Sequence, residues 1–241
     1  MYHTYKQTQV YYEIIGNGDI PIVFLHGWGG STQSFSFICK RLTFNYKALF
    51  IDFPPFGKSE EPQCDFTIFD YSEMVSQIME INGFNNPCIV GHSFGGRVAI
   101  LLASKNVAKN VILISSAGMK VRHGIKYYLK IYKHKIFKKL HIKNNGGSSD
   151  YKALSSNMRK TFVNIVTTNL EKYAINIKVP TILFWGKKDK DTPFYMAKRL
   201  KKLIADCEII AFNKSGHFCY IENCETFVNV INHFAVQDNK L

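Results

Sequence analysis

Long apolar runs are absent from this sequence of 241 residues. The apolar stretches, such as residues 112–114 and 182–185, are all far shorter than the ~20 residues that a membrane-spanning helix needs. Residues 1–10 are polar and aromatic, and they lack the apolar segment of a secretory signal peptide. We therefore expect a cytoplasmic protein with no membrane span.

The cysteine pattern contains no CxxC pair and no Cys/His cluster with the spacing of zinc ligands. The six cysteines are spread along the chain, and Cys88 and Cys207 fall in predicted strands, where a thiol acts as a small apolar side chain. We expect neither a metal nor an organic cofactor. A reducing compartment fits this pattern best, although an even number of cysteines leaves disulfides open.

Acidic residues are missing between Glu80 and Asp150, and lysines accumulate there. The whole chain carries a formal net charge of +13 at pH 7, and such a field attracts acidic partners. Two interpretations stay open. The lysines reflect a lysine-rich composition of the whole chain, or they form a basic surface that docks an acidic carrier protein or steers an anionic substrate. We predict no nucleic-acid partner.

Short apolar runs alternate with amphipathic segments of helical length, which indicates an α/β fold with a mostly parallel sheet. Thr67 and Asp70 are the expected capping residues of the second helix. The predicted strands are residues 10–15, 21–25, 46–51, 88–90, 111–115, 181–185 and 208–212, and the predicted helices of the core are residues 31–42, 67–81, 93–104, 193–203 and 224–234.

The alternation is interrupted at residues 118–178, which have no clear strand pattern. Apolar residues recur there at helical spacing over residues 125–140, with lysines between them. A loop of Asn, Gly and Ser at 144–149 precedes a second predicted helix at 151–170. We expect one core domain, residues 1–117 and 179–241, with residues 118–178 inserted as a helical unit.

Ser93 lies in Gly91-His92-Ser93-Phe94-Gly95, which fits the G-x-S-x-G pattern of a nucleophilic serine. The match alone is weak, but a predicted strand precedes it and a predicted helix follows it. A sharp turn between these two elements would lift the hydroxyl out of the sheet, and the flanking glycines avoid a Cβ clash. The start of the helix leaves the Phe94 N–H free to donate to a developing oxyanion.

A glycine-rich loop, HGWGG at residues 26–30, follows the predicted strand at residues 21–25. Such a loop lets the backbone come close to the nucleophile, so the Trp28 N–H is the expected second oxyanion donor. We expect His26 to order this loop by hydrogen bonding rather than to transfer protons.

A weakly acidic serine hydroxyl needs a base, and the base needs a carboxylate that orients it. In this fold type the carboxylate and then the histidine follow the serine along the chain, in loops after strands. His217 lies in such a loop, whereas His233 falls inside the last predicted helix, so His217 is the predicted base. Asp189 and Asp191 both follow the strand at residues 181–185, and their position leaves either as the acid.

Together these segments make the chain resemble the α/β-hydrolase superfamily over nearly its whole length. The resemblance implies a mostly parallel central sheet with helices on both faces and a small helical cap, residues 118–178, inserted after the sixth strand. It also implies that the acid is Asp189, three residues after the Trp-Gly pair. The matching segments are HGWGG at 26–30, DFPPFGKS at 52–59, GHSFGG at 91–96, VPTILFWGKKD at 179–189 and SGHF at 215–218.

Several positions depart from the pattern of that superfamily. Pro55 replaces a usual glycine, Cys224 replaces a usual proline, and the HGGPG loop of proline iminopeptidases is absent. Serine at position 93 argues against the dehalogenase and epoxide-hydrolase branches, which use Asp there. The esterase and C–C bond hydrolase branch is the most similar, but the cap lacks the Trp that ring-cleavage-product hydrolases usually have. Arg159 is either the Arg that accompanies that Trp or a solvated helix charge.

We therefore predict a hydrolase whose catalytic triad is Ser93, Asp189 and His217, with the Trp28 and Phe94 N–H groups as oxyanion donors. It would act through an acyl-enzyme on a small-molecule carbonyl substrate, for which a carboxylic ester fits best. Three alternatives stay open: C–C bond hydrolysis of ring-cleavage-type diketones, acyl transfer to an acceptor other than water, and ligand binding without turnover.

Overall fold

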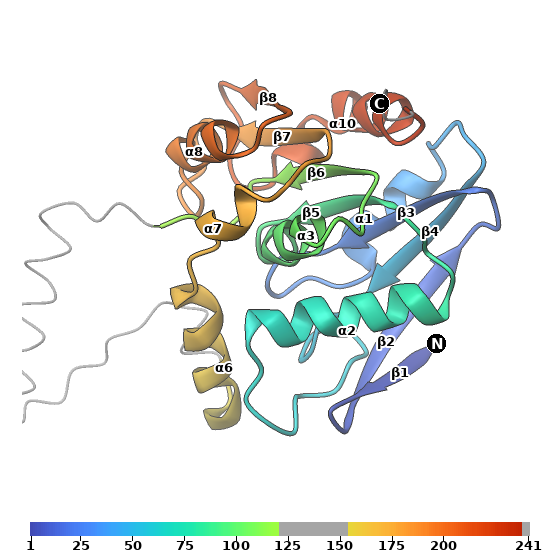
Figure 1. The fold of residues 1–241 in the computed structure, drawn as a ribbon, viewed down its shortest axis with the longest axis vertical. Helices are drawn as coiled ribbons and strands as arrows, with labels where there is room; N and C mark the ends of the chain where they lie inside the picture. Colours follow the sequence, from blue (N-terminus) through green and yellow to red (C-terminus); the bar gives the residue numbers. More distant parts are fainter. Residues whose placement is uncertain (121–153, 238–241) are drawn as a thin grey trace, which may run out of the picture.

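The computed structural model describes residues 1–120 and 154–237, and its strands form one eight-stranded sheet in the order β1-β2-β4-β3-β5-β6-β7-β8 (Figure 1). β2 pairs antiparallel with β1 and with β4, and all other neighbouring pairs are parallel. The strands are β1 (Tyr2–Tyr5), β2 (Thr8–Ile15), β3 (Ile20–Leu25), β4 (Tyr46–Ile51), β5 (Cys88–His92), β6 (Asn110–Ile114), β7 (Thr181–Gly186) and β8 (Cys207–Phe212).

Helices cover both faces of the sheet (Figure 1). Alternate residues of a strand point to opposite faces, and β3 shows this clearly. Val23 and Leu25 belong to the core under α2, α3 and α8, whereas Ile22 and Phe24 belong to the core under α1, α9 and α10. The helices of the described residues are α1 (Gln33–Cys39), α2 (Ile68–Ile81), α3 (Phe94–Ser104), α6 (Ser156–Thr167), α7 (Glu171–Ala174), α8 (Tyr195–Leu203), α9 (Cys219–Glu222) and α10 (Cys224–Phe234).

The predicted α/β fold is confirmed, and so is each predicted strand, with small shifts at its ends. The short edge strand β1 was not predicted. It joins β2 through Lys6 and Gln7, which both have positive φ, and neither residue is the Asn or Gly that normally signals such a hairpin turn. The helix expected at residues 31–42 is shorter, because α1 ends at Cys39. Ser93 precedes α3 as its N-cap residue and is not part of the helix.

Only part of the predicted insertion lies within the described residues. The helix expected at 125–140, with its lysines, lies outside them, whereas α6 and α7 fall at the end of the insertion. The two ends of the insertion meet, because the Leu170 N–H donates to the Gly118 carbonyl over 2.8 Å. The Lys120 N–H also donates to the Glu171 carboxylate over 3.1 Å. α7 contacts both α3 and α8, so the chain returns to the sheet along these helices.

The loops that follow β3, β5, β7 and β8 all leave the carboxyl edge of the parallel part of the sheet. In open α/β sheets this edge is where ligands bind. These loops carry the glycine-rich segment at 26–30, Ser93, Asp189 and His217. All six cysteines are free thiols, and no helix of the described residues is long and apolar enough to span a membrane.

The capping box predicted at the start of α2 is confirmed. The Asp70 N–H donates to the Thr67 hydroxyl, and the Thr67 N–H donates to the Asp70 carboxylate over 2.6 Å. These two bonds satisfy backbone donors that the first turn of a helix leaves without partners.

We expect Thr67→Ala to lower the free energy of unfolding by about 1 kcal/mol, because the helix loses its N-cap acceptor. Urea unfolding of the two proteins measures the difference. Thr67→Ser keeps the hydroxyl and is the control. Equal losses in both variants would show that the methyl group, and not the cap, carries the effect.

Candidate active site

Ser93 occupies a strained turn between β5 and α3. Its φ of +49° lies in the left-handed region, which residues other than glycine seldom adopt. The surrounding backbone holds this geometry, because the Ser93 N–H donates to the Ile114 carbonyl and the Ala117 N–H donates to the Ser93 carbonyl. A Cβ on Gly95 would lie 2.1 Å from the Leu25 carbonyl oxygen, so the turn fits against β3 only with glycine there.

The glycine-rich loop after β3 lies directly against this turn. A Cβ on Gly27 would be 3.3 Å from the Cβ of Ser93 and 2.7 Å from Nδ1 of His92. Within the described residues, the backbone N–H groups of Trp28 and Phe94 have no backbone acceptor. Two N–H groups close to a serine hydroxyl are the usual construction of an oxyanion hole.

His26 ties the glycine-rich loop to the loop after β4. Its Nδ1–H donates to the Gly27 carbonyl over 2.7 Å, and its Nε2 accepts from the Phe53 N–H over 2.9 Å. Burial lowers the pKa of His26 to about 4, so the ring is neutral at pH 7. The expectation that His26 orders this loop is confirmed by these two hydrogen bonds.

Asp52 joins the same two loops, a role that was not predicted from the sequence. Its Oδ1 accepts from the Thr32 N–H at the start of α1, and its Oδ2 accepts from the Lys58 N–H over 2.8 Å. The buried carboxylate therefore fixes the backbone on both sides of the site. Asp52 and Lys58 both lie in the DFPPFGKS segment, which was the available signal, but Thr32 lies 20 residues earlier and could not be inferred from it.

Asp189 and His217 are hydrogen-bonded to each other at the ends of β7 and β8. His217 Nδ1–H donates to Asp189 Oδ2 over 2.9 Å. The other oxygen, Oδ1, accepts from the backbone N–H groups of Asp191 and Thr192. Burial alone would raise the pKa of the Asp189 carboxyl, but the bond and the charge of His217, with the bonds from Thr192, hold its pKa below the usual value. Asp189 is therefore an anion at pH 7, and it orients the imidazole.

Two further residues support this pair. The Thr192 hydroxyl lies 2.7 Å from Asp189 Oδ2 and 2.9 Å from the Ser115 carbonyl oxygen, and it can donate a hydrogen bond to either of them. His92 Nε2–H donates to the backbone carbonyl of His217 over 3.1 Å. Burial, and then the proximity of His217, lower the pKa of His92 to about 3. Aspartate side chains often accept hydrogen bonds from backbone N–H groups two or three residues later, and this tendency was the sequence signal that could have indicated the role of Thr192.

Ser93 and His217 line one pocket of about 590 Å³ at the carboxyl edge. Within the described residues no hydrogen bond joins the Ser93 hydroxyl to His217, and in unliganded enzymes such contacts are often long and tighten only with substrate. The structure thus brings all five predicted site residues to one place. The lining residues are Trp28, Ser93, Phe94, Arg97, Ala117, Gly118, Met119, Phe162, Ile165, Val166, Asp191, Thr192, Met196, His217 and Phe218.

Comparisons with known proteins find relatives along nearly the whole chain. The AB hydrolase superfamily protein YisY of Bacillus subtilis is 26% identical and covers 96% of this chain and 97% of its own length. The pimeloyl-[acyl-carrier protein] methyl ester esterase of Wigglesworthia glossinidia brevipalpis is 27% identical, and the match covers 95% of this chain and 98% of the esterase. Further relatives are named as lipases and as 2-hydroxy-6-oxononadienedioate hydrolases.

The solved structure of MGS-M2, an alpha/beta hydrolase enzyme from a Medee basin deep-sea metagenome library, has a TM-score of 0.79 at 22% identity and covers 100% of this chain and 99% of its own. The family model of the alpha/beta hydrolase fold matches residues 20–134. The chain therefore has the alpha/beta hydrolase fold and is similar to members of that superfamily over nearly its whole length.

One group of side chains at the pocket that contains Ser93 and His217 has the composition of a metal site. Asp189, Asp191 and His217 offer ligand atoms that all lie within 4.8 Å of one another, and the described residues contain no other such group. Both oxygens of Asp189 already accept hydrogen bonds, and His217 Nδ1 already donates one. These hydrogen bonds account for the arrangement of the group, so we assign no metal to it.

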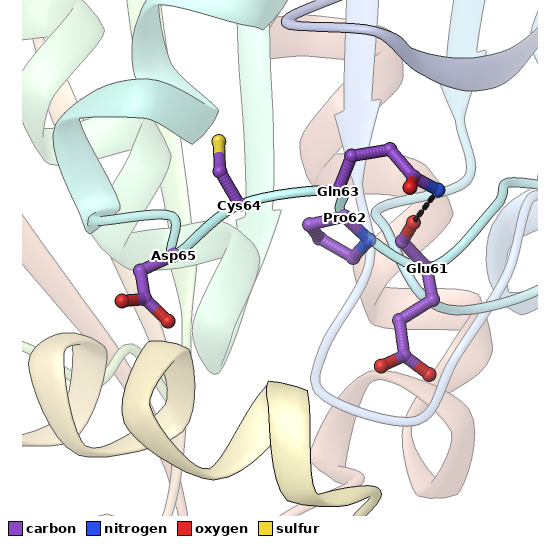
Figure 2. Close-up of a pocket in the computed structure, with 5 residues that line it drawn as sticks. All are labelled: Glu61, Pro62, Gln63, Cys64 and Asp65. Carbon is purple, nitrogen blue, oxygen red and sulfur yellow. Dashed lines mark hydrogen bonds between the residues drawn. The ribbon is translucent and has the colours of Figure 1, made fainter.

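α6 forms one wall of the pocket that contains Ser93 and His217. The loop at residues 61–65 contacts the N-terminal half of this helix (Figure 2). The side chains of Glu61 and Asp65 point toward α6. The Ser155 hydroxyl donates to Glu61, and Lys160 forms an ion pair with Asp65. From the pocket side of the same helix, Phe162 packs edge-on against Trp28, with ring centroids 5.1 Å apart.

The two buried neutral imidazoles make a pH dependence of stability predictable. Between the ordinary histidine pKa of 6.5 and about pH 4, the unfolded chain binds protons at His26 and His92 that the folded protein excludes. Stability therefore falls as the pH is lowered through this window, by up to about 1.4 kcal/mol per pH unit for each imidazole.

Urea unfolding across this window measures the slope, and we expect His92→Gln to make it less steep. His233→Gln removes an exposed imidazole on α10 and is the control, for which we expect the same change of unfolding free energy with pH as in the parent protein. A parent slope retained by His92→Gln would mean that His92 is protonated in the folded state.

Proposed function

We propose that this protein is a serine-nucleophile hydrolase that cleaves carboxylic esters of small molecules through an acyl-enzyme. The observation that carries the proposal is the hydrogen-bonded Asp189–His217 pair, which lies in one pocket with a serine on a strained strand-to-helix turn. Nucleophile, base and orienting carboxylate in this arrangement are the requirements of triad chemistry.

Each residue has a distinct role in the proposed reaction. Ser93 Oγ attacks the ester carbonyl carbon while His217 Nε2 takes its proton, which is feasible because Nδ1 carries the proton bound to Asp189. The Trp28 and Phe94 N–H groups stabilise the oxyanion of the tetrahedral intermediate. His217 then protonates the departing alcohol. Water, activated by the same imidazole, releases the acid and restores Ser93.

The pocket walls favour an acyl group with apolar carbons next to the carbonyl. The Trp28 ring lies edge-on to the rings of Phe56, Phe94 and Phe162 at centroid distances of 4.8 to 5.5 Å. The same walls would also accept a ring-cleavage-type diketone or an acyl donor for transfer, so the choice among these substrates rests on turnover measurements.

We also propose that residues 118–178 form a cap over the site. Support comes from the described part, since Phe162, Ile165 and Val166 of α6 line the same pocket as Ser93. The lysines of the proposed basic surface, among them Lys126, Lys130 and Lys133, lie outside the described residues. Docking of an acidic carrier at that surface stays a proposal on charge alone.

We expect Ser93→Ala to abolish hydrolysis of activated esters such as p-nitrophenyl acetate while the protein stays folded. A fluorophosphonate probe should label the parent protein at Ser93, because labelling requires an activated serine, and should leave Ser93→Ala unlabelled. Mass spectrometry of the labelled peptide locates the adduct. A parent protein with neither label nor turnover would refute the proposed function and favour a ligand-binding role.

We expect Asp189→Asn to lower kcat by a factor on the order of 10⁴, because the amide favours the wrong imidazole tautomer. Asp191→Asn is the matched control, since Asp191 is exposed two residues away and its carboxylate makes no hydrogen bond to His217 within the described residues. Steady-state kinetics on one ester compares the two. A crippled Asp191→Asn beside a mild Asp189→Asn would move the acid to Asp191.

A further inference from the structure

Arg97 is a buried cation on the wall of the active-site pocket. It lies on α3, one helical turn after Ser93, and its relative exposure is 7%. Its guanidinium donates to the backbone carbonyls of Thr168, over 2.9 Å, and Val166, over 3.4 Å. Both acceptors are neutral oxygens at the end of α6, and a guanidinium has five N–H donors. Three of these donors therefore have no acceptor among the described residues.

The positive charge of Arg97 also has no carboxylate partner within the described residues. Arginine is seldom buried without such a partner, because removing its charge from water is costly. Burial lowers the pKa of Arg97 to about 10, so the side chain remains a cation at pH 7. The pocket thus contains a fixed positive charge and free donors, which together match a carboxylate.

Asp191 indicates which part of the substrate bears that carboxylate. It lines the same pocket, and its carboxylate lies within 4.8 Å of the ligand atoms of Asp189 and His217. Under the proposed mechanism the leaving alcohol sits beside His217, which protonates it. A negative charge on the alcohol would therefore face Asp191. An anionic group on the acyl part avoids this repulsion and can reach Arg97.

We infer that Arg97 is a specificity-determining residue that binds a carboxylate at the far end of the acyl group. The preferred substrates would then be half-esters of dicarboxylic acids with a neutral alcohol. Ser93 would take up the carboxyacyl group and release the alcohol, and water would then release the free dicarboxylate. This inference rests on the proposed function, because it assigns a substrate class to the same site.

Matched pairs of substrates test the inference. Monoethyl esters of linear dicarboxylic acids of graded length are each compared with the ethyl ester of the monocarboxylic acid that has the same number of carbons. We expect kcat/KM to be about tenfold to a hundredfold higher for the anionic member at the best length, as hydrogen bonds to a charged group usually contribute. An equal or lower kcat/KM for every anionic member would overturn the inference.

Arg97→Met should remove this preference, because kcat/KM should fall at least about tenfold more for the anionic esters than for the neutral esters of equal length. Arg97→Lys keeps the charge and should restore part of the preference. Lys105→Met is the matched control, because it removes an exposed charge at the other end of α3 and should leave the preference intact. An equal loss on both substrate series in Arg97→Met would make Arg97 a structural clamp of α6 and overturn its role in specificity.

A measurement on the parent protein keeps the inference testable if Arg97→Met does not fold. The dicarboxylate product should inhibit hydrolysis of a neutral ester competitively, at a concentration at least about tenfold lower than the monocarboxylate of equal length. Equal inhibition by the two acids would overturn the inference while neutral-ester turnover and Ser93 labelling still support the hydrolase. Absence of both turnover and labelling would instead refute the proposed function, and this inference with it.

Discussion

The close contact between the turn at Ser93 and the end of β3 is the constraint on which the site depends. Gly95 donates its N–H to the His26 carbonyl, and its Cα lies so close to the Leu25 carbonyl that no side chain fits. This contact fixes the serine, the start of α3 and the glycine-rich loop as one unit. The backbone N–H groups of Trp28 and Phe94, the proposed oxyanion donors, are therefore positioned by packing, which is what electrostatic preorganisation requires.

Three histidines near this unit differ in chemistry because their surroundings differ. His26 and His92 are buried, and both rings form hydrogen bonds to backbone groups. Burial lowers their pKa values to about 4 and about 3, so both rings are neutral at pH 7. His217 has the Asp189 carboxylate as partner and lines the pocket. Only His217 thus combines access to substrate with a neighbouring charge that stabilises an imidazolium. The proposed division between structural and catalytic histidines follows from these contacts.

In the proposed function, α6 links the catalytic residues to the choice of substrate. Residues near its N-terminus are held by Glu61 and Asp65, and the carbonyls at its C-terminus are held by Arg97. Between these attachments the helix presents Phe162 to Trp28. One residue, Arg97, therefore both anchors the wall of the pocket and places a charge inside it. In the proposed function, the aromatic side chains favour methylene carbons near the reacting carbonyl, and Arg97 favours an anionic end beyond them.

The sequence by itself determined the alternation of strands and helices, the Thr67–Asp70 cap, the turn at Ser93 and the placement of Asp189 and His217 at strand ends. All of these depend on patterns within a few residues, because hydrophobic period and turn chemistry are local properties. Tertiary structure decided the roles of Asp52, Thr192 and Arg97, as well as the pairing of β1. Each of these three side chains bonds to a residue at least 20 positions away, namely Thr32, Ser115 or Thr168, and only the folded backbone sets those distances. β1 pairs with the adjacent β2 through a turn at Lys6 and Gln7 that lacks the usual sequence signal.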